Sequence, residues 1–378
     1  MKVALVSFHS FYKPGGVKRH ILGLAKEFKK RGIETKIIVP RRKRDEDYGK
    51  DVILLGTSFP FPFSGSVSDL TINFNPLAIE DTLKREKFDV LHFHNFGFPS
   101  ILQILASPAA SKTLNILTFH ANLAGSKFMK RFPILLDLIN KICQWKIDGI
   151  IGVAPFILEY FKEYPGPKIV IPNGLDLEIF NPNIEKLKKY SDDKINILFL
   201  GRIEERKGLI YLLKAYKILE KTFSDLRLIV VGEGPLKENL EKWVKNNKLK
   251  NVVFEGKGPE EKAALYYKSC DIFCSPAIFG ESFGLVLVEA MACGKPVVAF
   301  ANEGYKEVLK GKGAKFLVKP KDYKTLAKKL AILIKNPKLR KEMGQWGIEE
   351  AKKYSWPKIA NQILDFYQMC LKEKEQKK

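Results

Sequence analysis

Short apolar strands alternate with helical stretches along this chain, and the alternation begins twice. Residues 2–8 have the composition of a buried strand, residues 17–31 have the apolar periodicity of a helix, and residues 33–39 form the next strand. The same order begins again at residues 195–200, with a helix expected over 208–221. Strand–helix–strand units join parallel strands. Each half therefore predicts a doubly wound α/β domain.

The break between the two halves is a polar, charged stretch over residues 181–194. Further strands of the first half are expected at residues 51–55, 88–93, 114–119, 147–153 and 168–171. We expect a Rossmann-like domain over residues 1–185, a second over 186–354 and a final helix within 355–378. Ser355 can cap that helix and Pro357 suits its first turn.

The composition is that of a globular chain. With 378 residues, 46% of them hydrophobic, the chain is long enough for two domains and too apolar to be disordered. No apolar run approaches the ~20 residues that span a membrane, and the first residues lack the pattern of a signal peptide. Five cysteines without a CxxC spacing fit buried thiols better than disulfides or zinc. We therefore expect a cytoplasmic protein.

The formal net charge of +23 indicates that binding partners are anionic, but it does not identify the class of anion. Such an excess can draw a protein to nucleic acid, anionic lipid or phosphorylated small molecules, or it can be solvated lysine on helices. Nucleic-acid binding would need a basic-aromatic cluster or a recognition helix, and the sequence shows neither. We expect no nucleic-acid partner.

The stretch from Phe279 to Phe300 combines a glycine-rich turn, an apolar helix and two carboxylates. Glu281 lies in the turn and Glu289 lies inside the helix. A helix start presents free N–H groups and the positive end of the helix dipole, which suits a phosphate. Carboxylates nearby can accept hydrogen bonds from hydroxyls. The stretch thus fits a diphosphate flanked by two polyols, as in a nucleotide sugar, although both residues could also be ordinary helix charges.

Two further loops follow apolar strands and suit phosphate. Gly15 and Gly16 come after the opening strand, where glycine lets backbone N–H groups approach an anion; a plain turn is the alternative. Arg202 and Lys207 come after the first strand of the second half. Arginine offers a planar fork for phosphate oxygens and lysine a compact charge. A solvated basic loop is the alternative here.

The spacing Glu281-x7-Glu289 resembles the signature of retaining glycosyltransferases of family 4. That family has the GT-B fold, in which two Rossmann-like doubly wound domains face a deep cleft and the last helix crosses back to the first domain. The resemblance extends from Pro14-Gly-Gly to Ser355-Trp-Pro. The residues from Lys13 to Ala25, with His92-Phe-His and Thr118-Phe-His, look most like the phosphatidylinositol mannosyltransferase branch.

The resemblance implies roles for individual residues. The catalytic set would be His120 near the transferred sugar, Arg202 and Lys207 on the departing diphosphate, and Glu281 on the sugar hydroxyls. The donor-binding set would be Gly15, Gly16, Phe283, Gly284, Leu285 and Glu289, the last accepting from ribose hydroxyls. Asn173, in Pro-Asn-Gly, reads as a cleft edge and hinge without chemistry.

The sequence offers two weak hints of a metal site. Asp45-Glu46-Asp47 fits the Asp-x-Asp string of other glycosyltransferases, but it lies in a charge run after Arg41–Arg44 rather than at a strand end. His92 and His94 could chelate a metal on one strand face, but no third ligand is evident. We expect neither a metal nor a cofactor, with the nucleotide sugar as a substrate.

These features predict a metal-independent retaining transferase that moves a hexose from GDP-mannose or a UDP-sugar to a hydroxyl acceptor. Lipid, polyol and oligosaccharide acceptors stay open. The basic and apolar segment 127–146 could press into an anionic membrane surface, which would place the protein at the inner membrane face, or it could be a core helix with basic ends. A nucleotide-sugar epimerase of the same fold and a soluble-acceptor transferase are the alternatives.

Overall fold

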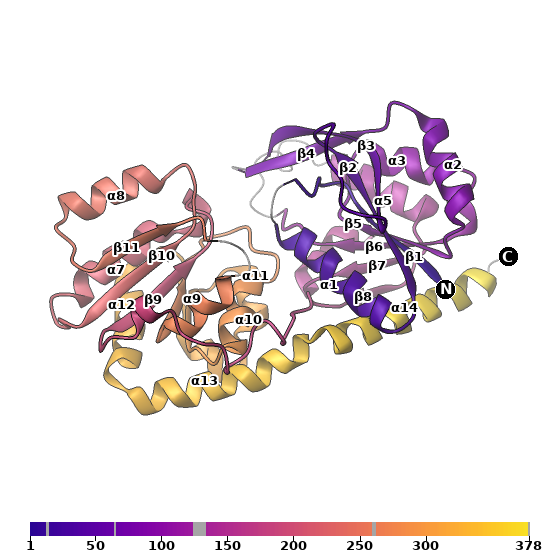
Figure 1. The fold of residues 1–378 in the computed structure, drawn as a ribbon. Coiled ribbons are helices and arrows are strands. Elements are labelled where there is room, and N and C mark those ends of the chain that lie inside the picture. The colour runs from indigo at the N-terminus through magenta and orange to yellow at the C-terminus, as the bar shows by residue number, and fades with distance from the viewer. Residues whose placement is uncertain (13–14, 64–65, 124–133, 259–261, 377–378) are drawn as a thin grey trace. The chain divides into compact units, whose positions relative to one another are not determined.

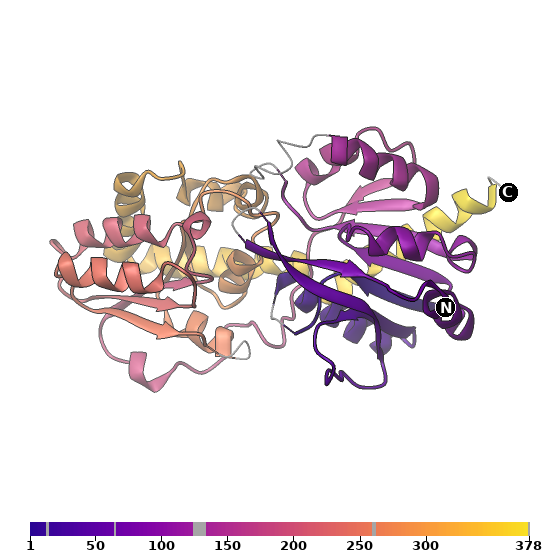
Figure 2. The same ribbon diagram turned by 90° about the horizontal axis from the view of Figure 1, so that it is seen from above.

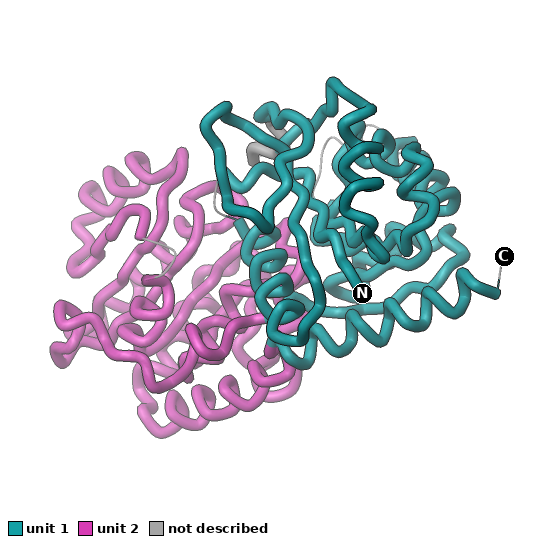
Figure 3. The backbone as a smooth tube through the Cα atoms, turned by 45° about the vertical axis from the view of Figure 1, so that its right-hand side comes forward, with its two compact units in different colours: residues 1–174, 356–378 teal, residues 175–355 magenta. Residues whose placement is uncertain are grey.

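The structure is a computed structural model that describes residues 1–12, 15–63, 66–123, 134–258 and 262–376 (Figure 1). The chain divides into two compact units, coloured separately in Figure 3. Unit 1 combines residues 1–174 with residues 356–378, and unit 2 is the continuous segment 175–355. Each unit is an α/β layer structure built on one sheet, as the alternation of strands and helices predicts.

Unit 1 is built on an eight-stranded sheet with the order β4-β3-β2-β1-β5-β6-β7-β8. Its strands are β1 (Lys2–Ser7), β2 (Glu34–Arg41), β3 (Val52–Phe63), β4 (Ser66–Ile72), β5 (Val90–His94), β6 (Leu114–Phe119), β7 (Gly149–Gly152) and β8 (Lys168–Val170). All neighbours pair in parallel except β3 and β4, which are antiparallel.

The helices of unit 1 cover this sheet. They are α1 (Gly16–Lys30), α2 (Pro76–Glu86), α3 (Ser100–Leu105), α5 (Ile134–Lys146), α6 (Pro155–Leu158) and α14 (Trp356–Gln376). The last helix lies beside α1 in both Figure 1 and Figure 2. Ile21, Leu24 and Phe28 of α1 share a fully buried core with Ile359 and Ile363 of α14 and with the central strands. The apolar stripe at i, i+3, i+4 and i+7 is what makes α1 a helix of this layer.

Unit 2 has a six-stranded parallel sheet with the order β11-β10-β9-β12-β13-β14. Its strands are β9 (Ile195–Leu200), β10 (Leu226–Val231), β11 (Val252–Gly256), β12 (Ile272–Ser275), β13 (Val297–Phe300) and β14 (Leu317–Val318). Its helices are α7 (Leu209–Leu219), α8 (Lys237–Asn246), α9 (Ala263–Ser269), α10 (Leu285–Ala292), α11 (Glu303–Val308), α12 (Tyr323–Lys335) and α13 (Pro337–Ala351). Its main core lies between β9, β10 and β12 and the helices α7, α12 and α13.

Each sheet reverses its strand order at one place. In unit 1, β1 pairs with β2 on one side and with β5 on the other. In unit 2, β9 pairs with β10 on one side and with β12 on the other. Ligands of open α/β sheets bind beyond the carboxyl ends of the strands at such a switch point. The segments after β1, β5, β9 and β12 are therefore where a site is expected.

The structure differs from the sequence expectations in two respects. The unit boundary lies at residues 174 and 175 rather than at 185, because the segment between them already packs on unit 2: the rings of Phe180 and Tyr267 are 6.0 Å apart. The first sheet also gains the antiparallel edge strand β4, which the strand–helix pattern did not predict. The proline-containing strand β3 joins it directly, without a crossover helix.

Candidate active site

In unit 2, the loops after β9 and β12 are joined at the switch point. The backbone N–H of Ile278 donates to the carbonyl oxygen of Arg206 at 2.7 Å. Gly208 closes the first loop with φ of 67°, and a Cβ there would lie 2.1 Å from the carbonyl oxygen of Pro276. Only glycine fits such a position. The sequence Arg206-Lys207-Gly208 is thereby held against the turn that contains Glu281.

A charge network lies where these loops meet. The side chains of Arg206 and Lys207 both donate to Oε1 of Glu281, at 2.8 and 2.7 Å. Arg206 also pairs with the buried carboxylate of Glu204 at 2.6 Å, and Arg202 pairs with the same carboxylate at 3.2 Å. Arg202 is about half exposed, whereas Lys207 and Glu281 are 14% and 12% exposed. Three predicted residues, Arg202, Lys207 and Glu281, thus lie in one network.

Interactions within the network shift the pKa values of Glu281 and Arg206 toward their charged forms. Burial opposes ionisation of Glu281, but Lys207 and Arg206 outweigh it and hold the pKa of this carboxyl below its usual value. Burial also opposes the charged form of Arg206, and here Glu281 and then Glu204 raise its pKa. Arg206 and Glu281 are therefore both charged at neutral pH.

The start of α10 lies immediately after this turn. Its N-cap, Gly284, has φ of 106°, and a Cβ there would lie 2.6 Å from the ring of Tyr305. No side chain among the described residues caps the helix, so its first N–H groups stay available to an anion. The predicted residues Phe283, Gly284 and Leu285 form this helix start, and Phe283 is anchored by an edge contact with the ring of Tyr354.

Glu289 lies deeper in α10 and is fully buried. The hydroxyl of Tyr267 donates to its Oε2 at 2.8 Å. The sequence predicted a carboxylate that accepts from hydroxyls, and in the structure a tyrosine hydroxyl is one such donor.

In unit 1, the predicted glycines begin α1. Gly15 is the N-cap and Gly16 the first helical residue, and no side chain of the described residues caps this end. A Cβ at either glycine would meet no atom within 4 Å. Among the described residues of unit 1, none therefore blocks an anion from approaching the first turn of α1.

His120 follows β6, next to the end of β5. Its Nε2 lies 3.1 Å from Nδ1 of His94, and its Nδ1 lies 3.1 Å from Oδ1 of Asn173. The side chain of Asn95 accepts from the backbone N–H of His120. Burial lowers the pKa of His120 to about 3, so the imidazole is neutral at pH 7. Asn173, which the sequence placed at a hinge, orients His120.

The remaining histidines of β5 and α1 complete this region. His92 contacts Oγ1 of Thr118 at 2.6 Å through Nε2 and the hydroxyl of Tyr367 at 2.6 Å through Nδ1, which accounts for both of its nitrogens. His94 lies instead beside His20 of α1 and His120. The sequence indicated no third ligand beside His92 and His94, whereas in the structure His20 and His120 lie beside His94.

The acidic run Asp45-Glu46-Asp47 has a structural role. Glu46 accepts from the backbone N–H groups of Arg42 and Lys43, and Asp47 accepts from that of Gly49. The three carboxylates form no metal cluster among the described residues.

The basic and apolar segment 127–146 lies partly outside the described residues, which resume at α5. On α5, the side chains of Ile134, Leu138 and Trp145 are exposed and share one helical face. The expectation of a core helix with basic ends does not hold for this face. None of the described helices is both long and apolar enough to cross a membrane.

Comparisons with known proteins match nearly the whole length of the chain. The family model described as Glycosyltransferase Family 4 matches residues 14–179, and the one described as Glycosyl transferases group 1 matches residues 180–350. A phosphatidyl-myo-inositol mannosyltransferase of Mycobacterium leprae is 33% identical, with 97% of this chain and 96% of the relative covered. An uncharacterized glycosyltransferase of Methanocaldococcus jannaschii is 28% identical, with coverage of 97% and 98%.

Solved structures share the fold at lower identity. Sucrose-phosphate synthase from Thermosynechococcus elongatus has a TM-score of 0.78 at 21% identity, over 98% of this chain and 99% of its own. The Anabaena protein HepE, in complex with UDP and glucose, has a TM-score of 0.74 at 18% identity, over 97% and 99%.

Proposed function

The chain belongs to glycosyltransferase family 4 and has the GT-B fold, and on that premise we propose that it transfers a hexose, with retention of configuration, from a nucleoside diphosphate sugar to a hydroxyl acceptor. The observation that carries the proposal is the charge network of Arg206, Lys207 and Glu281 at the switch point of unit 2, beside the uncapped start of α10. Fixed cations, free amides and a carboxylate are the groups that a sugar diphosphate needs.

The diphosphate binds to the basic loop and to helix amides. Arg202 and Lys207 neutralise the charge that develops as the diphosphate leaves, and the first N–H groups of α10 add the positive end of a helix dipole. In unit 1, the amides of Gly15 and Gly16 at the open start of α1 have the same chemistry. No metal ion is required at the diphosphate in this scheme.

The sugars bind to carboxylates and backbone. Glu281, held by two cations, accepts from the hydroxyls of the transferred sugar together with the backbone of Phe283, Gly284 and Leu285. Glu289 accepts from the ribose, with Tyr267 as its partner before the donor binds. His120 contacts the transferred sugar as a neutral imidazole. The acceptor hydroxyl attacks from the side of the leaving group, whose phosphate oxygen takes the proton.

In its more specific form, the proposal is that the donor is a mannosyl nucleotide and the acceptor is a lipid. Relatives that are 32–33% identical over 97% of this chain are named phosphatidyl-myo-inositol mannosyltransferases. The exposed face of α5 supports contact with a lipid surface, because Ile134, Leu138 and Trp145 share it with the exposed Lys141. We therefore favour GDP-mannose as donor and an inositol phospholipid as acceptor, with the protein peripheral to the membrane.

A donor panel followed by a transfer assay tests the proposal. Thermal shifts with GDP- and UDP-sugars identify the donor, and transfer of labelled hexose to lipid vesicles measures turnover. Lys207→Ala and Glu281→Ala should each lower turnover about 100-fold or more while the fold is retained. Lys352→Ala, which removes an exposed ion pair with Glu349, is the matched control and should leave turnover unchanged.

Three outcomes would contradict parts of the proposal. Unchanged turnover in both site variants would overturn the assignment of the site. Conversion of the donor to another nucleotide sugar without any acceptor would indicate an epimerase. Transfer to a soluble hydroxyl compound with no transfer to vesicles would overturn the lipid acceptor.

A further inference from the structure

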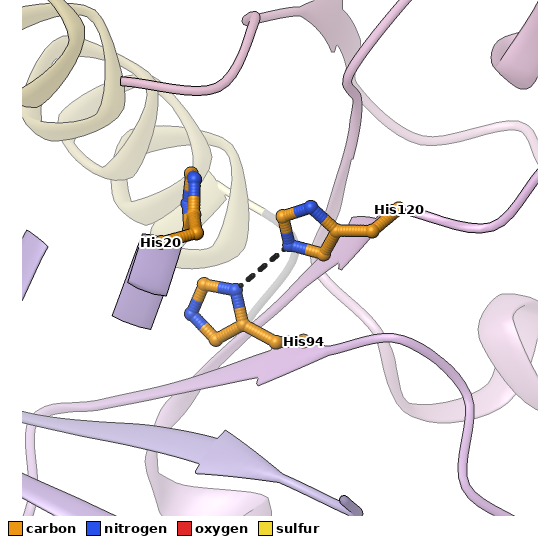
Figure 4. Close-up of side chains that lie close together, drawn as sticks. All are labelled: His20, His94 and His120. Atoms are coloured by element: carbon orange, nitrogen blue, oxygen red, sulfur yellow. Dashed lines mark hydrogen bonds between the residues drawn. The ribbon is translucent and has the colours of Figure 1, made fainter. Parts of the chain in front are cut away.

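Three histidine side chains from three elements of unit 1 meet in the interior. His20 comes from α1, His94 from the end of β5 and His120 from the residue after β6, as Figure 4 shows. All three are buried. One ring nitrogen of each lies within 4.8 Å of the corresponding nitrogens of the others. Among the described residues, no other group of histidines, cysteines and carboxylates meets this condition.

The hydrogen bonds of this cluster are incomplete. Because Oδ1 of Asn173 can only accept, Nδ1 of His120 carries the proton, and its Nε2 presents a lone pair to Nδ1–H of His94. Nε2 of His94 and both nitrogens of His20 then have no hydrogen-bond partner among the described residues. A buried polar group without a partner costs roughly 1–3 kcal/mol. Three such nitrogens in one cluster call for an explanation.

The protonation state suits metal coordination. Burial lowers the pKa of His20 and of His94 well below the usual value, and the neighbouring histidines lower both further. The side chain of Asn173 opposes this for His20, although the two do not meet in hydrogen-bond geometry. All three imidazoles are therefore neutral at pH 7, which is the form that binds a metal.

We propose that His20, His94 and His120 together bind one divalent transition-metal ion of the zinc class, each through one ring nitrogen. Three imidazoles with a fourth position for water are an established ligand set for Zn²⁺. In a tetrahedral site with Zn–N bonds of about 2.0–2.1 Å, neighbouring ligand nitrogens are about 3.3 Å apart. The 3.1 Å between His94 and His120 is close to that edge.

Binding needs a modest rearrangement of side chains. His20 is the ring without hydrogen bonds, so it can turn toward the other two without losing any. The proton on Nδ1 of His94 moves to its Nε2, which frees the Nδ1 lone pair for the ion. Asn173 continues to accept from Nδ1–H of His120, the contact with which metal-binding histidines are commonly oriented.

The site shares no residue with the proposed diphosphate site, although Gly16 and His20 lie on the same helix. It lies within unit 1, whereas Arg202 and Lys207 belong to unit 2, and it contains no oxygen ligand that would favour Mg²⁺. It shares His120 with the proposed sugar contact: with Nδ1 held by Asn173, Nε2 can meet the ion or the sugar but not both, so a bound ion should compete with the donor. Metal binding is measured without any enzymatic assay, so its outcome is read separately from that of the proposed function. The competing explanation is that the rings pack against Trp356, whose ring centre lies 5.1 Å from that of His20, and bind nothing.

The test is a metal titration of the full-length protein after treatment with a chelator. Co²⁺ alone should bind at one ion per chain with the visible absorption of a four-coordinate site, and Zn²⁺ alone should displace it and raise the melting temperature. Mg²⁺ should do neither. X-ray absorption of the zinc-loaded wild type should show three imidazoles in the first shell.

Matched variants locate the site. His20→Phe keeps an aromatic ring beside Trp356 and removes both unpartnered nitrogens, so it should fold and bind Co²⁺ at least tenfold more weakly. His9→Gln changes one of the two histidines outside the cluster, on the loop after β1, and should bind Co²⁺ as the wild type does. Absence of saturable Co²⁺ binding by the wild type, an imidazole-free shell, or unchanged affinity in His20→Phe would each overturn the proposal. Should His20→Phe not fold, the X-ray absorption of the wild type decides.

Discussion

Glu281 is the residue on which the site of unit 2 is centred, because two cations donate to the same one of its oxygens. In a partly buried setting, such a carboxylate stabilises the cations as much as they stabilise it. Removing its charge would leave Lys207 without the carboxylate that holds it, while Arg206 would keep Glu204. Glu281 thus connects substrate binding to the stability of the loop.

Glu281→Gln should therefore lower the free energy of unfolding at pH 7 by roughly 3 kcal/mol. Because the folded pKa of Glu281 is lowered, its contribution is complete above the ordinary pKa near 4.5 and is lost as the pH falls through the lowered value. Urea unfolding of both proteins should show a difference in the free energy of unfolding that is constant from pH 7 to about pH 5 and shrinks from there to pH 3. Glu349→Gln, in an exposed pair, serves as control. A difference that does not change with pH would contradict this reading.

Sequence reasoning reached some residues of the site and missed others for a physical reason. Lys207 and Glu281 each follow a strand end, and that local signal identified them. Arg206 stands in a run of charges that reads as solvated, and only the packing of the two loops brings it onto Glu281. His20 occupies the apolar face of its helix four residues before Leu24, so its burial was predictable. Its partners, however, come from distant strands, and no local pattern encodes that.

At the scale of elements, the close packing of α14 on α1 depends on glycine. A Cβ at Gly23 of α1 would lie 2.3 Å from the indole of Trp356, and one at Gly174 would lie 2.4 Å from the same side chain. Trp356 is the first residue of α14, and it also contacts His20. The indole therefore sets how closely the last helix approaches the first.

Gly23→Ala should destabilise the protein by about 1–2 kcal/mol, because overpacking of 1–3 kcal/mol outweighs a gain in helix propensity of up to about 1 kcal/mol. Thermal or urea unfolding measures the change. Gly16→Ala in the same helix meets open space and should not destabilise. In a Trp356→Leu background the cost of Gly23→Ala should largely disappear. An equal cost in both backgrounds would mean that the indole is not the obstacle.

Elements were predicted best where apolar runs are short and bounded by turns. The bounds of β9 agree with the sequence expectation of 195–200 because a charged residue, Lys194, and a glycine, Gly201, flank the run. The β3–β4 pair was missed because prolines interrupt β3 beyond residue 59 and because four of the seven residues of β4 are polar, without a regular alternation. The two strands pair along an antiparallel register from Thr57–Ile72 to Phe63–Ser66, and no apolar run in the sequence indicates this pairing.

At the scale of the whole molecule, unit 2 is inserted into unit 1. The chain passes from one unit to the other after residue 174 and again after residue 355, and these two places lie side by side in each unit. In unit 2, the N–H of Leu175 donates to the carbonyl oxygen of Tyr354 at 2.7 Å. In unit 1, Gly174 packs on Trp356. The returning segment supplies Ile359, Ile363 and Phe366 to the core of unit 1. Unit 1 is therefore incomplete without the carboxyl-terminal helix.

A chain that ends at Ser355 should retain a folded unit 2 and an unstable unit 1. The loss uncovers the core beneath α14 and leaves Nδ1 of His92 without the Tyr367 hydroxyl. Limited proteolysis read by mass spectrometry should show cleavage within residues 1–174 and protection of 175–355. A chain that ends at Lys374, which keeps the partly buried Lys374–Asp148 pair, is the control. Equal protection of both units in the shorter chain would refute this dependence.

The insertion also has a consequence during synthesis. The ribosome releases residues 175–355 as one uninterrupted stretch, whereas the amino-terminal sheet must wait for residues 356–378, which follow unit 2 in the sequence. Unit 1 is therefore begun before unit 2 but completed after it. Until residues 356–378 are made, the nascent chain carries an apolar surface on its earliest strands, and the histidines there gain their final surroundings only when Trp356 and Tyr367 are in place.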